Sequence, residues 1–329
     1  MDLLNFFGSF VVLLEAVMGL LFSTLIIYLY YSGESDRTSF NFICVTRAVN
    51  NIFVLLLQFL CLMFPVLLLS SNIFPISIET YIIASTINVY MVNSYHCVLI
   101  GVNRFIAMFI PFHYSKLCGM KVTMVILALL YLERIYATIV KLLQEFDNHC
   151  RVHISLDSFG PHYEDSTCSK RLKDGFDGIL IVLIPLGIFA FTVILNLITF
   201  VKIMQFYIGV KEKKTFGYLK FIQRDGLDTN SSASMKNNIR LFFQTVLQDS
   251  LFFVDVLFTF KLSTLSEDRL WFFISQVFVW ESIHMLDGFI MLMFSNRLSI
   301  LKSKFSFSKQ NTVGNLENGR ASHTLPEIG

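Results

Sequence analysis

Long apolar runs recur along this chain and limit what it can fold into. The clearest is ILIVLIPLGIFAFTVILNLITFV at 179–201, which contains no charged residue. An apolar stretch of about 20 residues crosses a bilayer as an α-helix, because a helix satisfies its own backbone polar groups where no water can. Seven stretches qualify, at roughly 7–31, 42–69, 77–110, 122–143, 178–202, 239–262 and 270–294. Only 15% of the residues are charged, too few for a soluble surface. The sequence therefore predicts an all-α membrane protein, a bundle of seven transmembrane helices.

Basic residues are unevenly divided between the segments that join these spans. Seventeen Lys and Arg residues fall on one side, in 32–41, 103–121, 202–240 and 296–329. The opposite side holds six, in 144–177 and 261–269. Because cytoplasmic segments carry the excess of positive charge, this pattern predicts an N-terminus outside the cell and a C-terminus in the cytoplasm.

Two cysteines, Cys150 and Cys168, share the loop that this orientation places outside after the fourth span. Lone cysteines in one oxidising loop typically pair, and closing this loop would contribute about 3 kcal/mol by loop-closure entropy. The alternative is a metal site, because the same loop contains His149, His153 and His162. The spacing of these residues matches no standard zinc pattern, so we expect a disulfide and no metal.

The sequence contains no phosphate-binding glycine loop, paired CxxC or HExxH element. These motifs carry much of the recognisable chemistry of enzymes. We therefore expect no enzymatic activity, no cofactor and no nucleic-acid partner.

The inner end of the third span carries the most specific motif, NRFIAMFIPFHY at 103–114. It resembles the end of helix 3 in rhodopsin-like G-protein-coupled receptors, where an acid-Arg-aromatic triplet is followed by alanine, proline and tyrosine at these offsets. Within that superfamily the chain is most similar to the nematode serpentine chemoreceptors of class x (Srx). The similarity covers all seven spans and includes the cysteine pair and the ending HMLDGFIMLMFSNRL at 284–298.

This resemblance implies a function, a partner and a location. Such receptors detect an external small molecule, an odorant or pheromone, and activate a heterotrimeric G protein. They are placed in the plasma membrane, on the cilia of chemosensory neurons. The main rival is a seven-helix transporter or ligand-gated channel, for which acids inside the membrane would form an ion path; an inverted repeat and broken helices would favour it, and we find neither.

The chain departs from the receptor pattern around Arg104. Asn103 replaces the usual acid, and the inner end of the sixth span offers Lys236 and Arg240 where an acid is common. Arg104 is therefore left without either customary ion-pair partner. Asn103 is neutral at every pH, so proton uptake at this position cannot be part of the switch. The last span contains no lysine, which excludes a retinal Schiff base.

Arg104 by itself would read as a charge that reaches from a helix end to the membrane surface. The receptor motif favours a functional role instead, because charges at membrane depth are functional by default. Pro111 should break the helix near Ile110, leaving the guanidinium free to donate to backbone carbonyls of a G protein. The residues to which the resemblance assigns G-protein coupling are Asn103, Arg104, Phe105, Pro111 and Tyr114.

Several further ionisable residues lie inside the predicted spans. Asp249, His284 and Asp287 should lie at similar depths and form a polar switch between the sixth and seventh spans, or only hold helices together. Glu133 and Arg134 either neutralise one another or extend toward the surface. A ligand pocket between the third, fifth, sixth and seventh spans is weakly specified, because aromatic residues more often pack helices. Its candidates are Asn88, Tyr90, Asp255, Trp280 and Glu281.

The chain divides into a receptor domain, 1–307, and a polar tail, 308–329. After the last span, Leu298, Leu301 and Phe305 form one stripe among basic residues. This pattern predicts a short amphipathic helix on the inner leaflet, in contact with membrane lipids. The tail is predicted to be disordered.

Overall fold

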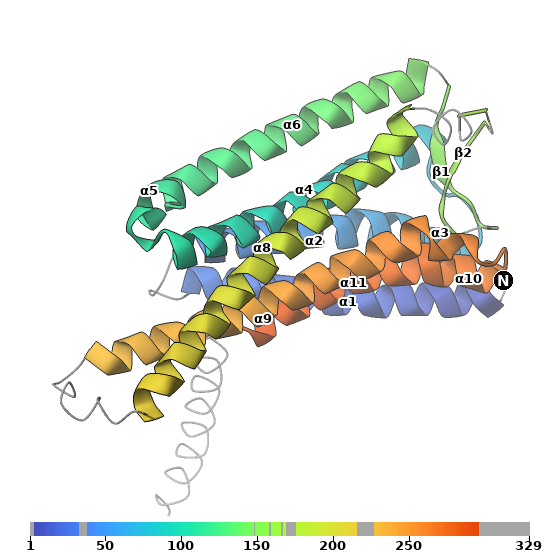
Figure 1. Ribbon diagram of the computed structural model, residues 1–329. Helices are drawn as coiled ribbons and strands as arrows, with labels where there is room; N and C mark the ends of the chain where they lie inside the picture. Colours follow the sequence, from blue (N-terminus) through green and yellow to red (C-terminus); the bar gives the residue numbers. More distant parts are fainter. Residues whose placement is uncertain are drawn as a thin grey trace, which may run out of the picture.

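Figure 1 shows the computed structural model, a bundle of long helices with a small hairpin at one end. The structure describes residues 3–32, 38–147, 149–157, 159–165, 167–168, 176–215 and 227–295. Side chains are described throughout these ranges except at 176–182, 206–215, 227–238 and 260. The predicted amphipathic helix after the last span and the tail 308–329 lie outside the described residues.

A helix, or a run of consecutive helices, covers each of the seven predicted spans. They are α1 (Leu3–Ser32), α2 (Ser39–Val54) with η1 (Leu55–Met63) and α3 (Phe64–Leu69), α4 (Ile76–Phe109), α6 (Met120–Asp147), α8 (Phe176–Thr215), α9 (Leu227–Phe260), and α10 (Arg269–Phe272) with η5 (Phe273–Phe278) and α11 (Val279–Met293). Short segments join them, namely η2 (Pro111–His113), α5 (Tyr114–Leu117), β1 (Val152–Ile154), β2 (Pro161–Tyr163) and η4 (Leu262–Thr264). The all-α prediction is therefore confirmed in outline.

Local sequence explains where several of these helices begin and end. The Thr38 hydroxyl accepts a hydrogen bond from the Asn41 backbone N–H at 3.2 Å and caps α2, and Asp268 caps α10 in the same way. At the far end of α4, Pro111 lacks a backbone N–H and stops the helix. The chain bends there by 119° into the segment Pro111–Leu117, as predicted for a break near Ile110.

Two segments, η1 and η5, are π-helical, with wider turns than an α-helix. At the end of η1 the Phe64 N–H donates to the Phe59 carbonyl five residues back. Pro65 follows directly and has no N–H to give. Such π-helical turns often lie at functional sites, and both segments pack against α1.

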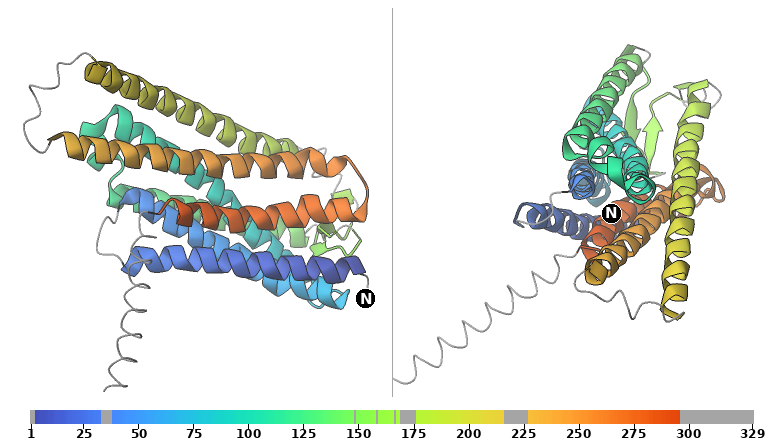
Figure 2. Two further views of the ribbon diagram at one scale, coloured as in Figure 1. Left: turned by 90° about the horizontal axis from the view of Figure 1, so that it is seen from below. Right: turned by 60° about the vertical axis from the view of Figure 1, so that its left-hand side comes forward.

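Small residues allow α1 and α11 to approach closely along their length. A Cβ atom on Gly19 would lie 2.5 Å from Leu55 Cδ1 and 3.2 Å from Met285 Cα, and one on Gly288 would lie 3.1 Å from Ser23 Oγ. Neither site has room for a side chain. The two helices run side by side in both views of Figure 2, as small residues permit at membrane helix interfaces.

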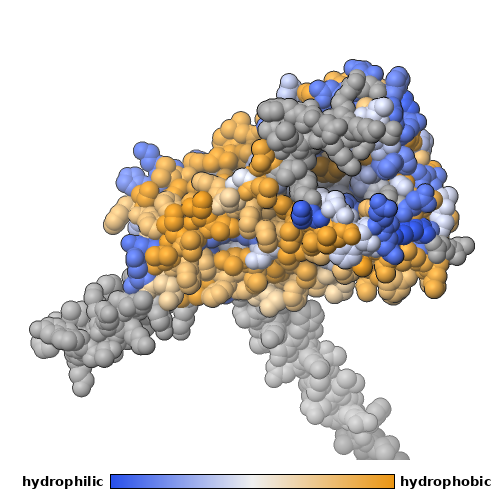
Figure 3. All heavy atoms as spheres, turned by 45° about the vertical axis from the view of Figure 1, so that its right-hand side comes forward, coloured by the Kyte–Doolittle hydropathy of each residue, from blue (hydrophilic) through white to orange (hydrophobic). Residues whose placement is uncertain are grey.

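The outer surface of the bundle is broadly apolar. Figure 3 shows hydrophobic residues over the middle of one face, with hydrophilic residues gathered mainly toward its ends. Among the described residues, five helices are long and apolar enough to cross a membrane, or six when α4 is taken with the segment bent from it. The stretch from α10 to α11, which carries Arg269, Glu281 and Asp287, is not among them. A count of seven spans stays a prediction from the sequence.

The hairpin β1–β2 belongs to the hydrophobic core. Its two strands pair antiparallel, with His153 opposite His162. Ile154 and Phe159 are fully buried in the cluster that contains Phe59 and Phe273, and the Phe159 and Phe273 rings lie 5.5 Å apart. The hairpin therefore closes one end of the bundle, which we call the hairpin end.

Candidate functional site

The opposite end of the bundle opens into a crevice of about 400 Å³, which we call the crevice end. Residues from α1, α2, α4, α8, α9 and α11 line it. Its described lining contains two arginines, Arg104 and Arg240, and no Asp or Glu. A crevice with this charge is suited to a partner that offers carbonyl or carboxylate oxygens.

Arg104 is the buried cation of this crevice. Its side chain, on the last turns of α4, is only 8% exposed. The guanidinium lies 4.9 Å above the ring of Phe40 on α2, which holds it by a cation–π contact. Its Nε and Nη2 have no hydrogen-bond partner. Buried N–H donors of a charged group are costly to leave unpaired, so these nitrogens are candidates to donate hydrogen bonds to oxygen atoms from outside the chain.

Asn103 belongs to a neutral contact beside Arg104. Its Nδ2 donates to Ser39 Oγ at 3.0 Å, and its Oδ1 accepts from the Tyr114 hydroxyl at 3.0 Å. Ser39 Oγ and the Tyr114 hydroxyl lie 3.2 Å apart. This triangle ties the end of α4 to the start of α2 and to α5. The acid of the receptor motif is thus replaced by an amide, which holds the hydroxyl of Tyr114. The rings of Phe105 and Phe109 stack with their centroids 4.5 Å apart.

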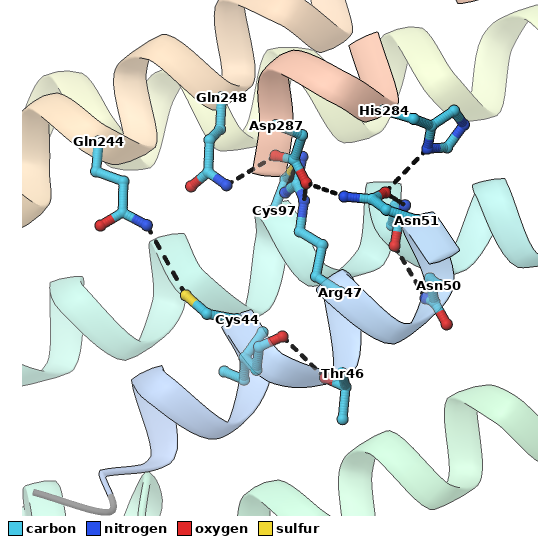
Figure 4. A network of polar contacts seen from close by, with 12 residues as sticks. Cys44, Thr46, Arg47, Asn50, Asn51, Cys97, Gln244, Gln248, His284 and Asp287 are labelled. Atoms are coloured by element: carbon cyan, nitrogen blue, oxygen red, sulfur yellow. Dashed lines mark hydrogen bonds and ion pairs between the residues drawn. The ribbon is translucent and has the colours of Figure 1, made fainter. Parts of the chain in front are cut away.

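A buried ion pair lies deeper in the bundle (Figure 4). Asp287 on α11 accepts from Arg47 Nε on α2 at 2.8 Å and from Asn51 Nδ2 at 2.7 Å. Gln248 Nε2 on α9 donates to its other oxygen at 2.8 Å. Arg47 also donates to Cys97 Sγ on α4 at 3.1 Å. One carboxylate therefore holds α2, α9 and α11 together, and Arg47 adds α4.

Arg47 is not among the site residues predicted from the sequence. The signal was present, because a charge inside an apolar span is a functional candidate by default. Its partner is 240 positions away in the chain, so only the tertiary structure identifies the pair. Arg47 is buried and Asp287 is among the least exposed acids of the described residues.

A chain of amide side chains extends from this ion pair across the bundle. His284 Nδ1 lies 2.9 Å from Asn51 Oδ1, which also accepts from Asn93 Nδ2 at 2.9 Å. Asn50 Nδ2 donates to Asn93 Oδ1 at 2.9 Å, and the Tyr131 hydroxyl on α6 donates to Asn50 Oδ1 at 2.6 Å. These links connect α11, α2, α4 and α6 through uncharged groups.

The predicted polar switch is connected differently from what the sequence indicated. Asp287 and His284 do share a network, through Asn51. Asp249 instead contacts Asn196 on α8, and its neighbour Gln248 reaches Asp287. The sixth and seventh predicted spans are thus joined through an amide.

The candidate ligand residues fall into two groups. Tyr90 donates a hydrogen bond to Asp255, and its ring lies 6.3 Å from Trp280 and 5.8 Å from His284. These side chains from α4, α9 and α11 therefore meet. Asn88 instead donates to the Ala84 carbonyl of its own helix at 2.9 Å.

Glu281 is fully buried, and neither carboxyl oxygen has a hydrogen-bond partner. The carboxyl of Glu15 on α1 acts on it electrostatically, and itself accepts from Ser282 Oγ at 2.9 Å and 3.0 Å. Burying a carboxyl that has no hydrogen-bond partner costs free energy, so the Glu281 side chain lowers the stability of the fold.

The described cavity beside the candidate ligand residue Tyr90 is small. A cavity of about 10 Å³ lies among Tyr90, Phe252, His284 and Asp287. That volume suits one water molecule and nothing larger. Toward the hairpin end, Trp280 packs against the core cluster that contains Ile154 and Phe159 of the hairpin.

Three helix residues, Glu79, Thr80 and Arg269, hold the hairpin over the bundle. The Ile154 backbone N–H donates to Glu79 Oε2 of α4 at 2.8 Å. Thr80 bonds to the backbone of Val152 in both directions, at 2.9 Å and 3.0 Å. Arg269 donates to the Leu156 carbonyl at 2.8 Å and lies 4.6 Å above the Phe159 ring. The loop is therefore anchored to two helices.

The predicted disulfide joins Cys150 to Cys168. With both thiols in this bond, the histidines would be the remaining ligands of the metal alternative. His153 and His162 lie 6.2 Å apart between ring centroids, and no group of three or more His, Cys, Asp or Glu side chains in the described residues is arranged to hold a metal. Burial, and then the charge of His162, lower the pKa of His153, while burial raises the pKa of Tyr163 to about 12.

A helical bundle with an apolar exterior, a buried polar core and a crevice at one end is the architecture of a polytopic membrane protein. Comparison with protein families identifies which kind. The model of the family described as serpentine type 7TM GPCR chemoreceptor Srx matches residues 13–295. The chain therefore belongs to this family, as the sequence resemblance predicted. No curated protein matches it.

Proposed function

We propose that this protein is a chemosensory receptor that binds an external small molecule and activates a heterotrimeric G protein. The observation that carries the proposal is the crevice lined by Arg104, whose Nε and Nη2 are buried and unpartnered. Family membership supports a chemoreceptor, and the charge of the crevice supports the partner. On this proposal the crevice end faces the cytoplasm and the hairpin end faces outward.

The G protein is proposed to insert the C-terminal end of a helix into the crevice. The last carbonyls of a helix lack intrahelical donors and carry partial negative charge. Arg104 offers the three N–H groups of Nε and Nη2 to such oxygens, and the described lining offers no acid to repel them. Outward movement of α9, which contributes Gln244 to the wall, would widen the crevice.

The ligand is proposed to act where Tyr90, Asp255 and Trp280 meet. Because Trp280 packs against the cluster that contains the hairpin residues Ile154 and Phe159, and the described cavity beside Tyr90 is only about 10 Å³, binding would require the hairpin or these side chains to move. Tyr90 touches His284, and His284 is bonded to Asn51, which holds Asp287. A displaced Tyr90 would therefore disturb the carboxylate that ties α9 to α11, and the ligand would shift an equilibrium between closed and open crevices.

The location follows from the same proposal. A receptor for external molecules belongs in the plasma membrane, and a chemosensory one in the cilium of a sensory neuron. Membrane lipids are its surroundings and an additional partner. Localising a tagged chain in sensory neurons tests this, and retention inside the cell body would contradict it.

The function can be tested by expressing the full chain in cells and applying fractionated small-molecule extracts. Nucleotide exchange on G proteins and membrane current are recorded together. Exchange without current is expected, and current without exchange would favour the channel alternative and overturn the receptor proposal.

Arg104 variants then test the crevice. Arg104→Ala should lower ligand-dependent exchange at least about tenfold, because it removes hydrogen bonds from a charged donor. Arg104→Lys is the matched control, since it keeps the charge and loses the planar fork of donors, and its exchange should fall between those of wild type and Arg104→Ala. Cell-surface amount is measured for each, and unchanged exchange in Arg104→Ala would refute the assigned role.

A further inference from the structure

Helix α6 is the most loosely packed of the long helices whose side chains are fully described. Of its 28 residues only Thr123, Leu127 and Glu145 are buried. It lies at the edge of the bundle, chiefly against α4 (Figure 1). In a membrane its remaining surface faces either lipid or another protein.

An ion pair sits on this helix between Glu133 and Arg134. The Arg134 guanidinium also lies 5.6 Å from the ring centroid of Tyr95 on α4, so it is turned toward the bundle. Glu133 is turned away, and its side chain is 49% exposed. Half of this acidic side chain is thus presented to whatever surrounds α6.

The depth of Glu133 makes this exposure unusual. Lys121 and Lys141 lie near the two ends of α6 and are 20 positions apart, about 30 Å along a helix. That length matches the hydrocarbon core of a bilayer. Glu133 lies near its middle, ~12 Å from the level of Lys141, too far for its short side chain to reach the surface. Arg134 compensates the charge of Glu133, but half of the carboxylate still faces outward at a depth where no water can hydrogen-bond to it, so a donor from a neighbouring protein would stabilise it.

The exposed face around Glu133 has the spacing of a helix–helix seam. Steps of four and three residues alternate along it, a mean period of about 3.5 that keeps one face toward a partner helix. Its members are Val125, Leu129, Leu132, Tyr136, Ile139 and Leu143. Glu133 lies beside this seam, and Tyr136, which is 71% exposed, brings a hydroxyl group into it.

We propose that this face of α6 is the contact surface of a homodimer. In a membrane, two copies related by a two-fold axis along the bilayer normal place each residue at the same depth as its counterpart. The same face of α6 carries a donor, the Tyr136 hydroxyl, and an acceptor, the Glu133 carboxylate, about one helical turn apart. Two copies of this face can therefore hydrogen-bond to each other. Each Tyr136 hydroxyl donates to the Glu133 carboxylate of the second copy, and the two contacts are equivalent by symmetry.

Disulfide cross-linking in native membranes tests the contact. Cys61 is the exposed free cysteine of the described residues, so all variants carry Cys61→Ser. Leu132→Cys places a thiol in the seam, and Leu197→Cys is the matched control on the lipid-facing side of α8, where Leu197 is similarly exposed. Mild oxidation should give a species of twice the chain mass with Leu132→Cys and not with Leu197→Cys.

The hydrogen bond is tested separately with Tyr136→Phe, which removes only the hydroxyl. Energy transfer between donor- and acceptor-labelled copies in vesicles, titrated against lipid, gives the dissociation constant. Tyr136→Phe should raise it about tenfold, because each of two bonds lost in a membrane is worth roughly a factor of three. The melting temperature of each variant confirms that the bundle is folded.

Three outcomes would overturn the homodimer. These are equal cross-linking by Leu132→Cys and Leu197→Cys, a cross-linked product whose mass shows a different partner chain, and an unchanged dissociation constant in folded Tyr136→Phe. None of them depends on whether the protein couples to a G protein, so this inference stands or falls independently of the proposed function.

Discussion

Breaking the ion pair between Arg47 and Asp287 should destabilise the bundle strongly. Asp287→Leu would leave the Arg47 guanidinium buried with no carboxylate, and Arg47→Met would leave the carboxylate with only amide donors. Removing one partner of a buried pair costs roughly 3–5 kcal/mol, because the remaining charge is uncompensated. Removing both partners can be close to neutral. The double variant should therefore be more stable than either single one.

The assay is thermal unfolding of purified receptor in detergent, followed by size-exclusion or intrinsic fluorescence. At about 2 °C per kcal/mol for a large domain, each single variant should melt roughly 6–10 °C below wild type. Lys121→Met is the surface control. Lys121 is exposed near the start of α6 and belongs to none of the ion pairs of the described residues, and exposed charges contribute about 0–1 kcal/mol.

Coupling between the two residues distinguishes an ion pair from two independent charges. If the double variant loses as much as the two single variants combined, the residues contribute independently and the pair is not the unit that holds these helices. If either single variant melts within about 2 °C of wild type, the partner left behind is not an uncompensated buried charge, and the expected loss of stability is wrong.

Three further predictions concern the buried acid Glu281 and the hairpin. Glu281→Gln should leave the melting temperature unchanged or raise it, because the carboxyl oxygens accept no hydrogen bond and Glu15 acts on them; a clear fall would show that the carboxylate is needed. Cys150→Ser should lower the cost of hairpin opening by about 3 kcal/mol, seen as faster hydrogen exchange of β1 amides, and unchanged exchange would contradict this. Because the pKa of His153 is lowered below its usual 6.5 in the docked hairpin, the opened hairpin binds a proton more readily. Hairpin stability should therefore be constant above about pH 6.5 and fall as pH drops below it, and His153→Gln should remove that part of the dependence of β1 exchange on pH.

The fold could be read from the sequence wherever one local property decided it. Apolarity over 20 or more residues located the long helices, since a helix in lipid must satisfy its own backbone. The missing N–H of Pro111 located the end of α4. Two lone cysteines in one loop predicted their pairing. None of these inferences required knowledge of a distant contact.

The site was less predictable because its contacts are between helices far apart in the chain. Asp249 and Asp287 are both single acids inside apolar spans, yet Asp249 contacts Asn196 and Asp287 contacts Arg47. Which partner each acid meets depends on the rotation of its helix about the helix axis. Span boundaries that are known to within a few residues do not determine that rotation. The hairpin was missed for another reason, since strands of three residues are too short for an alternating pattern.

The burial of Ile154 and Phe159 in the helical core has a consequence for how the protein matures. On the proposed orientation, this loop must cross the membrane during synthesis before it can dock. The core is therefore incomplete until translocation is finished and the Cys150–Cys168 bond has closed in the oxidising lumen. Export from the endoplasmic reticulum would then depend on lumenal redox chemistry, although most of the protein is embedded in lipid.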